Sequence, residues 1–159
     1  MRPERVQSGF TLVEVMVVVA IMGISMLAAL PSFRGYLQSN RVNDASRELS
    51  GRLRLARQSA VAEGVSRIAV WDFESDAYSI VRDSNADGQV QVGEPVLGPF
   101  LLPEGLDIES KVGEGFAGDQ IVFGPNGSAS GTGTVVLTNE AGYSLELTVL
   151  APTGQVRLN

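Results

Sequence analysis

Residues 83–94, with the sequence DSNADGQVQVGE, carry the most specific arrangement of potential ligand atoms in the chain. They match at every position the pattern D-x-[DN]-x-[DN]-G-x₅-E of calcium-binding loops. Such a loop surrounds Ca²⁺ with oxygen atoms, the ligands that this hard cation prefers. The predicted ligands are the side chains of Asp83, Asn85 and Asp87, the main-chain carbonyl of Gln89 and the carboxylate of Glu94.

The residues on either side of this loop differ from those of a helix–loop–helix calcium site. Both flanks have the composition of strands, and Pro95 follows the loop at once. Asp, Asn and Gly are also favoured in tight turns for their backbone geometry alone. The alternative is therefore a hairpin tip without a cation. We expect calcium as an optional ligand and predict no required cofactor.

Catalytic chemistry finds little support in the composition. The chain contains no His and no Cys, and Lys111 is its only lysine. A serine hydroxyl without a nearby base is a weak nucleophile. We therefore predict no catalytic residues and no enzymatic activity.

The second chemically unusual residue is Glu14, the only ionisable side chain between Phe10 and Leu30. A carboxylate in the middle of a bilayer costs on the order of 2.5–3.5 kcal/mol, less near an end, and it usually has a partner. The apolar run contains no Lys, Arg or His to provide one. The partner would come from another chain, or from an amine created by cleavage just upstream.

The apolar run itself, residues 10–30, predicts a membrane-spanning helix. Its 21 residues would extend roughly 31 Å, close to the ~30 Å of a bilayer core. A secretory signal peptide is one alternative, but its apolar core is typically about 7–15 residues and ends at a small-residue cleavage site. A buried core helix would need a larger domain around it. Arg2 and Arg5 favour a cytoplasmic N-terminus.

Apolar residues after this run recur at steps of three and four, which is typical of an amphipathic helix. These residues are Val42, Ala45, Leu49, Leu53, Ala56 and Ala60. Gly64 is a suitable helix stop, whereas Pro31 predicts a kink or a break. We therefore expect one long helix over residues 10–63, with residues 31–64 as the amphipathic continuation of the predicted span.

Charge is distributed unevenly along the chain, whose formal net charge is −6. Residues 32–63 carry six Arg and three acidic residues, whereas residues 65–159 carry four basic and thirteen acidic residues, a net charge of −9. The arginines form either a solvated helix face or contacts with acidic surfaces of neighbouring subunits. A large nucleic-acid interface is not expected in so acidic a domain, because phosphate binding requires clustered Lys and Arg.

After Gly64 the apolar pattern changes to a period of two, which indicates strands separated by turns. The predicted strands are residues 66–73, 77–82, 95–102, 106–109, 120–123, 134–137, 143–150 and 155–158, with a hairpin turn at residues 139–142. The predicted fold class is α+β. A long N-terminal helix, transmembrane in its first half and amphipathic in its second, packs on an antiparallel β-sheet head over residues 65–159.

The sequence GFTLVE at residues 9–14, followed by the apolar run, resembles the N-terminal motif of type IV pilin-like proteins. The resemblance implies that residues 1–9 are a leader peptide, removed by a prepilin peptidase that cleaves after Gly9. It also implies N-methylation of the new N-terminus at Phe10. Glu14 would then neutralise the N-terminal amine of a neighbouring subunit during assembly.

Other segments narrow the resemblance to the minor pseudopilins of the GspH/FimT group. These segments are residues 31–33, 40–41, 53–60, 121–127 and 154–158. Some type IV pilus members bind DNA and carry Gly-Arg-x-Arg near the C-terminus, whereas this chain has Gly154, Gln155, Val156 and Arg157. Because the first arginine of the pattern is missing, Arg157 is only a weak candidate and no nucleic-acid site is expected.

The resemblance implies a non-enzymatic subunit of a type II secretion pseudopilus, a structural component for protein export across the outer membrane. The alternative is a minor pilin of a type IV pilus system, active in pilus priming or DNA uptake. The implied location is the bacterial inner membrane, crossed once with the head in the periplasm, and then the periplasmic pseudopilus. The implied partners are other pilins or pseudopilins in a helical filament, the prepilin peptidase and the inner-membrane assembly platform.

Overall fold

The computed structural model describes the backbone of residues 10–111, 114 and 116–159, and the side chains of these residues except 27–38. The predicted leader, residues 1–9, and the predicted cleavage residue Gly9 lie outside the described residues. The chain divides into two compact units, Met1–Leu37 and Gln38–Asn159. The second unit contains the head.

Helix α1, Leu12–Glu63, confirms the long N-terminal helix expected from the sequence. The Thr11 hydroxyl accepts a hydrogen bond from the Glu14 N–H at 3.2 Å, as an N-cap residue does. At the other end, Gly64 has a φ of 68°, the left-handed conformation of a helix stop. The backbone is helical at Pro31 and on both sides of it, so the chain does not break there.

The predicted membrane span, residues 10–30, extends into residues 27–30, whose side chains lie outside the described part of the chain. The large apolar side chains described between Phe10 and Met26 are exposed, from 44% at Val18 to 83% at Phe10. Within the described residues, no helix is both long enough and apolar enough to cross a membrane.

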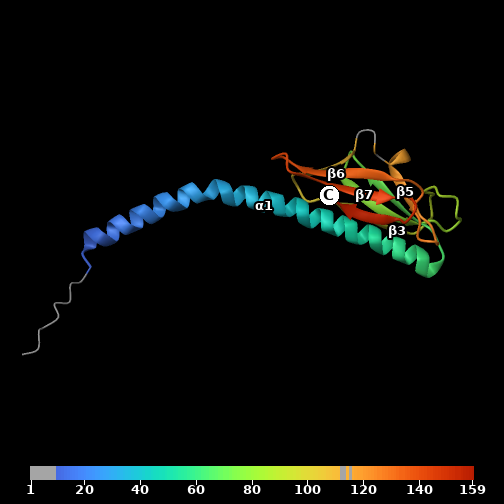
Figure 1. The fold of residues 1–159 in the computed structure, drawn as a ribbon, viewed down its shortest axis with the longest axis horizontal. Helices are drawn as coiled ribbons and strands as arrows, with labels where there is room; N and C mark the ends of the chain where they lie inside the picture. The colour runs from blue at the N-terminus through green and yellow to red at the C-terminus, as the bar shows by residue number, and fades with distance from the viewer. Residues whose placement is uncertain (1–9, 112–113, 115) are drawn as a thin grey trace, which may run out of the picture. The chain divides into compact units, whose positions relative to one another are not determined.

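Two four-stranded antiparallel sheets form the head (Figure 1). The first has the order β3-β2-β1-β5, with β1 (Arg67–Asp72), β2 (Ala77–Arg82), β3 (Val96–Leu101) and β5 (Gln120–Phe123). The second has the order β4-β6-β7-β8, with β4 (Leu106–Ser110), β6 (Gly133–Asn139), β7 (Ser144–Leu150) and β8 (Gln155–Leu158). A short 3-10 helix, η1 (Ala117–Asp119), precedes β5.

These strands confirm all the strand positions predicted from the sequence, with small differences at their ends. The predicted hairpin turn joins β6 and β7, and there the Gly142 N–H donates to the Asn139 carbonyl at 2.9 Å. The division into two sheets is not predicted. Strand β5 pairs with β1, placing Phe123 opposite Arg67, although β4 lies between them in sequence and joins the other sheet. Alternation of apolar residues does not identify a strand's partner.

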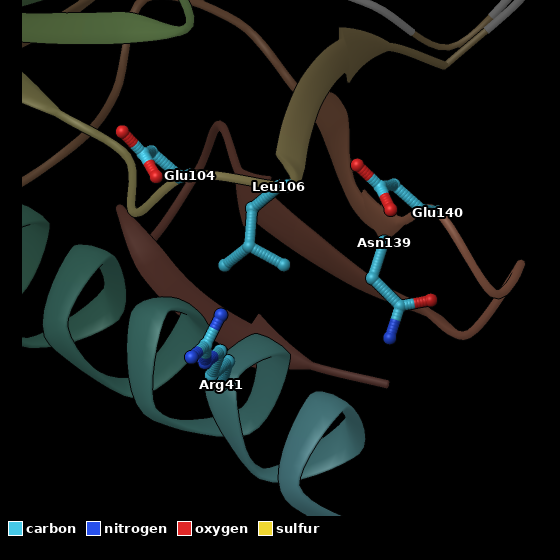
Figure 2. A pocket seen from close by; sticks show the side chains of 6 residues that line it. Arg41, Glu104, Leu106, Asn139 and Glu140 are labelled. Atoms are coloured by element: carbon cyan, nitrogen blue, oxygen red, sulfur yellow. The ribbon is translucent and has the colours of Figure 1, made fainter. Parts of the chain in front are cut away.

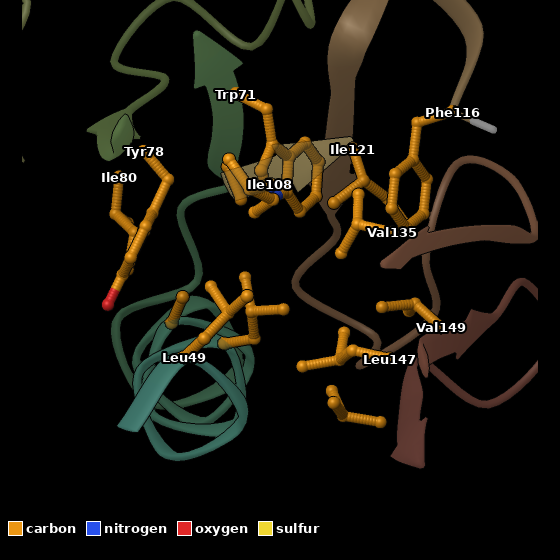
Figure 3. Packing of buried hydrophobic residues seen from close by; sticks show 14 of the residues in the cluster. Leu49, Trp71, Tyr78, Ile80, Ile108, Phe116, Ile121, Val135, Leu147 and Val149 are labelled. Atoms are coloured by element: carbon orange, nitrogen blue, oxygen red, sulfur yellow. The ribbon is translucent and has the colours of Figure 1, made fainter. Parts of the chain in front are cut away.

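The core lies between the second half of α1 and the two sheets. All six residues of the predicted helix stripe are buried, and Leu49 is 0% exposed. Leu49 belongs to one buried cluster with side chains from both sheets, and Figure 3 labels Trp71 and Leu147 among them. Trp71 stacks on Phe116 with ring centroids 4.5 Å apart. The amphipathic half of the helix is therefore an integral part of the head.

We expect Leu49→Ala to destabilise the head by about 2–5 kcal/mol, because truncation leaves a cavity between the helix and the sheets. The matched control is Leu55→Ala on the same helix. Leu55 is 57% exposed, and its truncation should cost less than about 1 kcal/mol. Urea unfolding followed by circular dichroism measures both values. Equal costs would contradict the packing of α1 described above.

Candidate functional sites

The N-terminal candidate site is built on the first turn of α1. Glu14 is the third residue of the helix, and its N–H is bound by the Thr11 hydroxyl. A carboxylate in the first helical turn is stabilised by the helix dipole. Phe10 lies four residues before Glu14, just outside the helix.

Phe10 and Glu14 line one surface hollow of about 340 Å³, together with Val15, Val18 and Val19. Glu14 is therefore an isolated carboxylate among apolar side chains, and in the described part of the chain it has no ion-pair partner. Chemically, the hollow can receive a cation carried by an apolar group. Cleavage after Gly9, methylation of Phe10 and the pairing role of Glu14 stay predictions.

The second candidate site, residues 83–94, connects β2 to β3 and is a hairpin connection, as its flanks predict. Asp83 is only 1% exposed. Its carboxylate accepts hydrogen bonds from the N–H groups of Asp87 at 3.2 Å and Gly88 at 3.0 Å. Gly88 has a φ of 74°, which suits glycine at this sharp turn. The buried aspartate therefore organises the start of the loop.

The other predicted ligands also form hydrogen bonds with groups of the same loop. The Glu94 carboxylate accepts from the N–H groups of Ser84 at 2.9 Å and Gln91 at 3.1 Å, so it closes the loop. The Asn85 amide donates to the Asp87 carboxylate at 3.0 Å. The Gln89 N–H donates to the same carboxylate at 2.8 Å.

These contacts bring the predicted ligands into one loop, but they satisfy its carboxylates with protein N–H groups. Across the described residues, no three acidic, His or Cys side chains converge closely enough to hold a metal ion. The hydrogen bonds of Asp83 and Glu94 shape residues 83–94 into a hairpin connection. Calcium binding by Asp83, Asn85, Asp87, Gln89 and Glu94 stays a prediction.

If the loop binds calcium, saturating Ca²⁺ should raise the melting temperature of the protein by on the order of 10 °C, because the ion stabilises only the folded state. The measurement is thermal unfolding in detergent with excess Ca²⁺ and again after excess EDTA. Glu94→Gln is the matched control, since it should remain folded and lose the response. Identical melting temperatures with Ca²⁺ and with EDTA would rule the ion out.

A polar cavity of about 220 Å³ lies between α1 and the second sheet, and no sequence pattern predicts it (Figure 2). Arg41 of the helix faces Leu106, and the carboxylates of Glu104 and Glu140 lie at either side. Asn139 is 5% exposed, and its side-chain oxygen accepts from the Tyr143 N–H at 2.9 Å. The Asn139 amide nitrogen has no partner among the described residues. The described lining of the cavity therefore combines one arginine with two glutamates.

A second unpredicted cluster lies where α1 meets β8. The Arg54 guanidinium donates to the Val156 carbonyl at 3.1 Å, and Arg57 donates to the Gly127 carbonyl at 2.7 Å. Arg157, the weak nucleic-acid candidate, donates instead to the Gln155 side chain at 3.1 Å. The sequence places Arg54 off the apolar stripe, but it does not reveal which head carbonyls the arginines reach.

Perturbed pKa values are scattered over the head and have structural causes. A hydrogen bond from Arg67, at 2.6 Å, lowers the pKa of Glu63 at the end of α1. The carboxylate of Glu146, at 2.9 Å, raises the pKa of Lys111. Burial raises the pKa of Tyr78 to about 12. An active site typically gathers such groups in one cleft. Here Glu63 and Lys111 belong to separate ion pairs, and the pKa of Tyr78 is raised by burial.

Two family models match the chain. The model described as "Type II transport protein GspH" matches residues 45–154. The model described as "Prokaryotic N-terminal methylation motif" matches residues 5–30. Together they cover most of α1 and nearly all of the head.

Curated relatives include fimbrial proteins. A fimbrial protein of Pseudomonas aeruginosa is 37% identical over 94 residues, which cover 55% of this chain and 60% of that protein. Fimbrial protein EcpC of Eikenella corrodens is 34% identical over 82 residues, covering 52% of this chain and 50% of that one. The chain thus spans less than two thirds of the length of these relatives.

Solved structures share the fold at low sequence identity. The minor pseudopilin EpsH of the type 2 secretion system of Vibrio cholerae has 16% identity and a TM-score of 0.57, covering 75% of this chain and 96% of that one. The type IV minor pilin FimU of Pseudomonas aeruginosa has 19% identity and a TM-score of 0.57, covering 78% of this chain and 92% of that one. These similarities establish a common architecture of helix and head.

Proposed function

Since the chain belongs to the family of type II transport protein GspH, we propose that it serves in a type II secretion system as a minor subunit of the pseudopilus. Its role there is structural, in the export of proteins across the outer membrane. The observation that carries the proposal is the family match over residues 45–154, which includes α1 from Ala45 onward and most of the head.

The resemblance to minor pseudopilins of the GspH/FimT group is confirmed by the family match, the N-terminal methylation motif and the fold. Pilins and pseudopilins are structural proteins that assemble into filaments with other pilins, and they are not enzymes. The prediction that this chain is not an enzyme is therefore confirmed through its family.

In the proposed assembly mechanism, a prepilin peptidase cleaves after Gly9 and the new amine at Phe10 is methylated. The cleaved terminus of a neighbouring subunit then brings its cation to Glu14. The hollow around Glu14 supports this role, because a carboxylate among valines has few other ways to gain a partner once water is excluded. The pairing would fix the register of neighbouring helices.

Before assembly, residues 10–30 would hold the subunit in the bacterial inner membrane, with its N-terminus in the cytoplasm and its head in the periplasm. The methylation motif at residues 5–30 supports this anchor. The inner-membrane assembly platform would then move the subunit into the periplasmic pseudopilus. The apolar surface of the helix would exchange lipid for neighbouring helices.

A type IV pilus is the second candidate system, and the fimbrial relatives favour it. In that system the chain would be a minor pilin that primes pilus assembly. DNA uptake is less well supported, because the head has four basic and thirteen acidic residues over 65–159. Phosphate binding along a strand needs clustered cations.

Deletion of the gene distinguishes the two systems. In a type II system, the deletion should abolish release of exported proteins into the medium and leave surface pili intact. In a type IV system, it should reduce surface pili and leave secretion unchanged. Both traits are measured in one strain, with the wild-type gene restored as the control. Normal secretion together with normal piliation would contradict both.

Processing is tested by Gly9→Ala, which should leave an uncut precursor that is nine residues longer than the mature chain. The size difference of roughly 1 kDa is read by mass spectrometry of the purified protein. Gly23→Ala, at a glycine inside the apolar run, should be cleaved normally. A fully cleaved Gly9→Ala chain would contradict the processing site.

A further inference from the structure

The junction of α1 and β8 holds two arginines in fixed positions on main-chain carbonyls. Arg54 donates one N–H to the Val156 carbonyl at 3.1 Å, and Arg57 donates its Nε–H to the Gly127 carbonyl at 2.7 Å. A guanidinium has five N–H donors. Each arginine therefore keeps further donors for a ligand, while its first hydrogen bond limits the side chain's freedom.

A bare glycine backbone makes the position of Arg57 possible. Gly154 is buried and has a φ of 58°. A Cβ at this position would lie 2.4 Å from the Gly127 carbonyl oxygen and 2.9 Å from the Arg57 Nε. The guanidinium thus lies directly against main chain from two loops, and the site is pre-organised before any ligand arrives.

Both arginines line a cavity of about 320 Å³, and its described lining contains no acidic residue. The lining residues are Arg54, Arg57, Gln58, Gly154, Gln155 and Val156. Arg157 lies two residues after Gln155 on β8, so both side chains project from the same face of the strand. The cavity, which we term the arginine cavity, therefore has a third cation nearby.

Three other arginines of the same unit, Arg52, Arg67 and Arg82, have carboxylate partners, whereas Arg41 and Arg47 have none within the described residues. Arg52 pairs with Glu48 at 2.7 Å, and Arg67 pairs with Glu63 at 2.6 Å. No ion pair of Arg54, Arg57 or Arg157 exists within the described residues. The chain has eighteen acidic and twelve basic residues. A cluster of arginines without a carboxylate partner is a distinct feature in such a chain, because its positive charge favours an anionic ligand.

We propose that the arginine cavity binds a carboxylate side chain from a neighbouring subunit of the filament. The inference rests on the proposed function, which supplies that neighbour. Planar guanidinium groups match carboxylates in geometry and charge. A protein carboxylate fits better than nucleic acid, because one acidic side chain needs only this local site. A nucleic-acid strand would extend over a head whose net charge is −9 at residues 65–159.

The test is site-specific photo-crosslinking in intact cells that assemble the filament, using the full chain. A photoreactive amino acid replaces Gln58, an exposed residue of the cavity lining. The same group at Val18, on the exposed apolar segment, reports assembly through the N-terminal helix. We expect an adduct from position 58 to a pilin or pseudopilin, attached within a segment that contains Asp or Glu.

Arg54→Gln tests whether the guanidinium carries the contact. Loss of one hydrogen bond to a charged group should reduce the adduct from position 58 about tenfold. Arg52→Gln is the matched control, because Arg52 already pairs with Glu48 and lies outside the cavity lining. It should leave the adduct unchanged. Arg54 is exposed, so its replacement should leave the head folded.

The outcomes separate this inference from the proposed function. An adduct from Val18 without one from position 58 would overturn the carboxylate site and leave filament assembly intact. An adduct from position 58 that survives Arg54→Gln, or that joins the chain to nucleic acid, would also overturn it. Absence of adducts at both positions would contradict the filament role and, with it, the site that depends on that role.

Discussion

Gly154→Ala is expected to destabilise the head by roughly 2–5 kcal/mol, the largest loss of stability for so small a change. Gly154 has a φ of 58°, a conformation that costs a residue with a Cβ about 1–2 kcal/mol. The new methyl group would also overlap the Gly127 carbonyl oxygen, from which its Cβ would lie 2.4 Å away. Backbone would have to move to relieve that contact.

Hydrogen bonds hold the backbone around Gly154 in place, so moving it to accommodate a methyl group costs free energy. Its N–H donates to the Leu150 carbonyl at 2.8 Å, which closes the turn between β7 and β8. The Gly127 carbonyl is held in turn by Arg57. Displacing either backbone segment would therefore strain or break one of these two hydrogen bonds.

Two control substitutions separate strain from overlap. Gly142→Ala carries the conformational cost alone, because Gly142 has a φ of 79° and the space within 4 Å of an added Cβ is open. Gly131→Ala meets neither obstacle and should change stability by less than about 1 kcal/mol. The measurement is the free energy of urea unfolding for all three variants. A Gly154→Ala variant no less stable than Gly142→Ala would show that the overlap is relieved without cost.

The elements of the fold follow from local patterns, whereas their pairing does not. The helix stripe from Val42 to Ala60 is predictable because a period of 3.6 identifies the buried face. The strands follow from alternation and turn residues. The pairing of β5 with β1 brings together residues that are distant in sequence, such as Phe123 and Arg67. No local pattern contains that information.

The candidate sites divide in the same way. Residues 83–94 are recognisable because all the predicted ligands lie in one loop, yet their carboxylates bind N–H groups of that same loop. The arginine cavity joins Arg54 and Arg57 of the helix to the β8 backbone, so the sequence shows the arginines without their surroundings. Spacing reveals a site within one segment, and tertiary structure is required for a site between segments.

The largest functional effect is expected from Glu14→Ala, which should reduce incorporation into filaments roughly 100-fold or more. If Glu14 neutralises a neighbour's amine, its truncation leaves a cation unpaired in apolar surroundings, a costly change for a buried ion pair. Membrane insertion should be unaffected, because removal of a carboxylate makes residues 10–30 more apolar. Incorporation is measured as the fraction of the chain in sheared or purified filaments, relative to the fraction in membranes.

Two further variants separate the charge of Glu14 from its place in the first helical turn. Glu14→Gln keeps the length of the side chain and removes its charge. Its incorporation into filaments should therefore fall nearly as far as that of Glu14→Ala. Thr11→Ala removes the hydroxyl that binds the Glu14 N–H and should cost the helix about 1 kcal/mol. Because the carboxylate remains, Thr11→Ala should still be incorporated. Normal incorporation of Glu14→Gln would refute charge pairing. If Thr11→Ala alone were not incorporated, the first helical turn would be needed for capping of the helix and not for its charge.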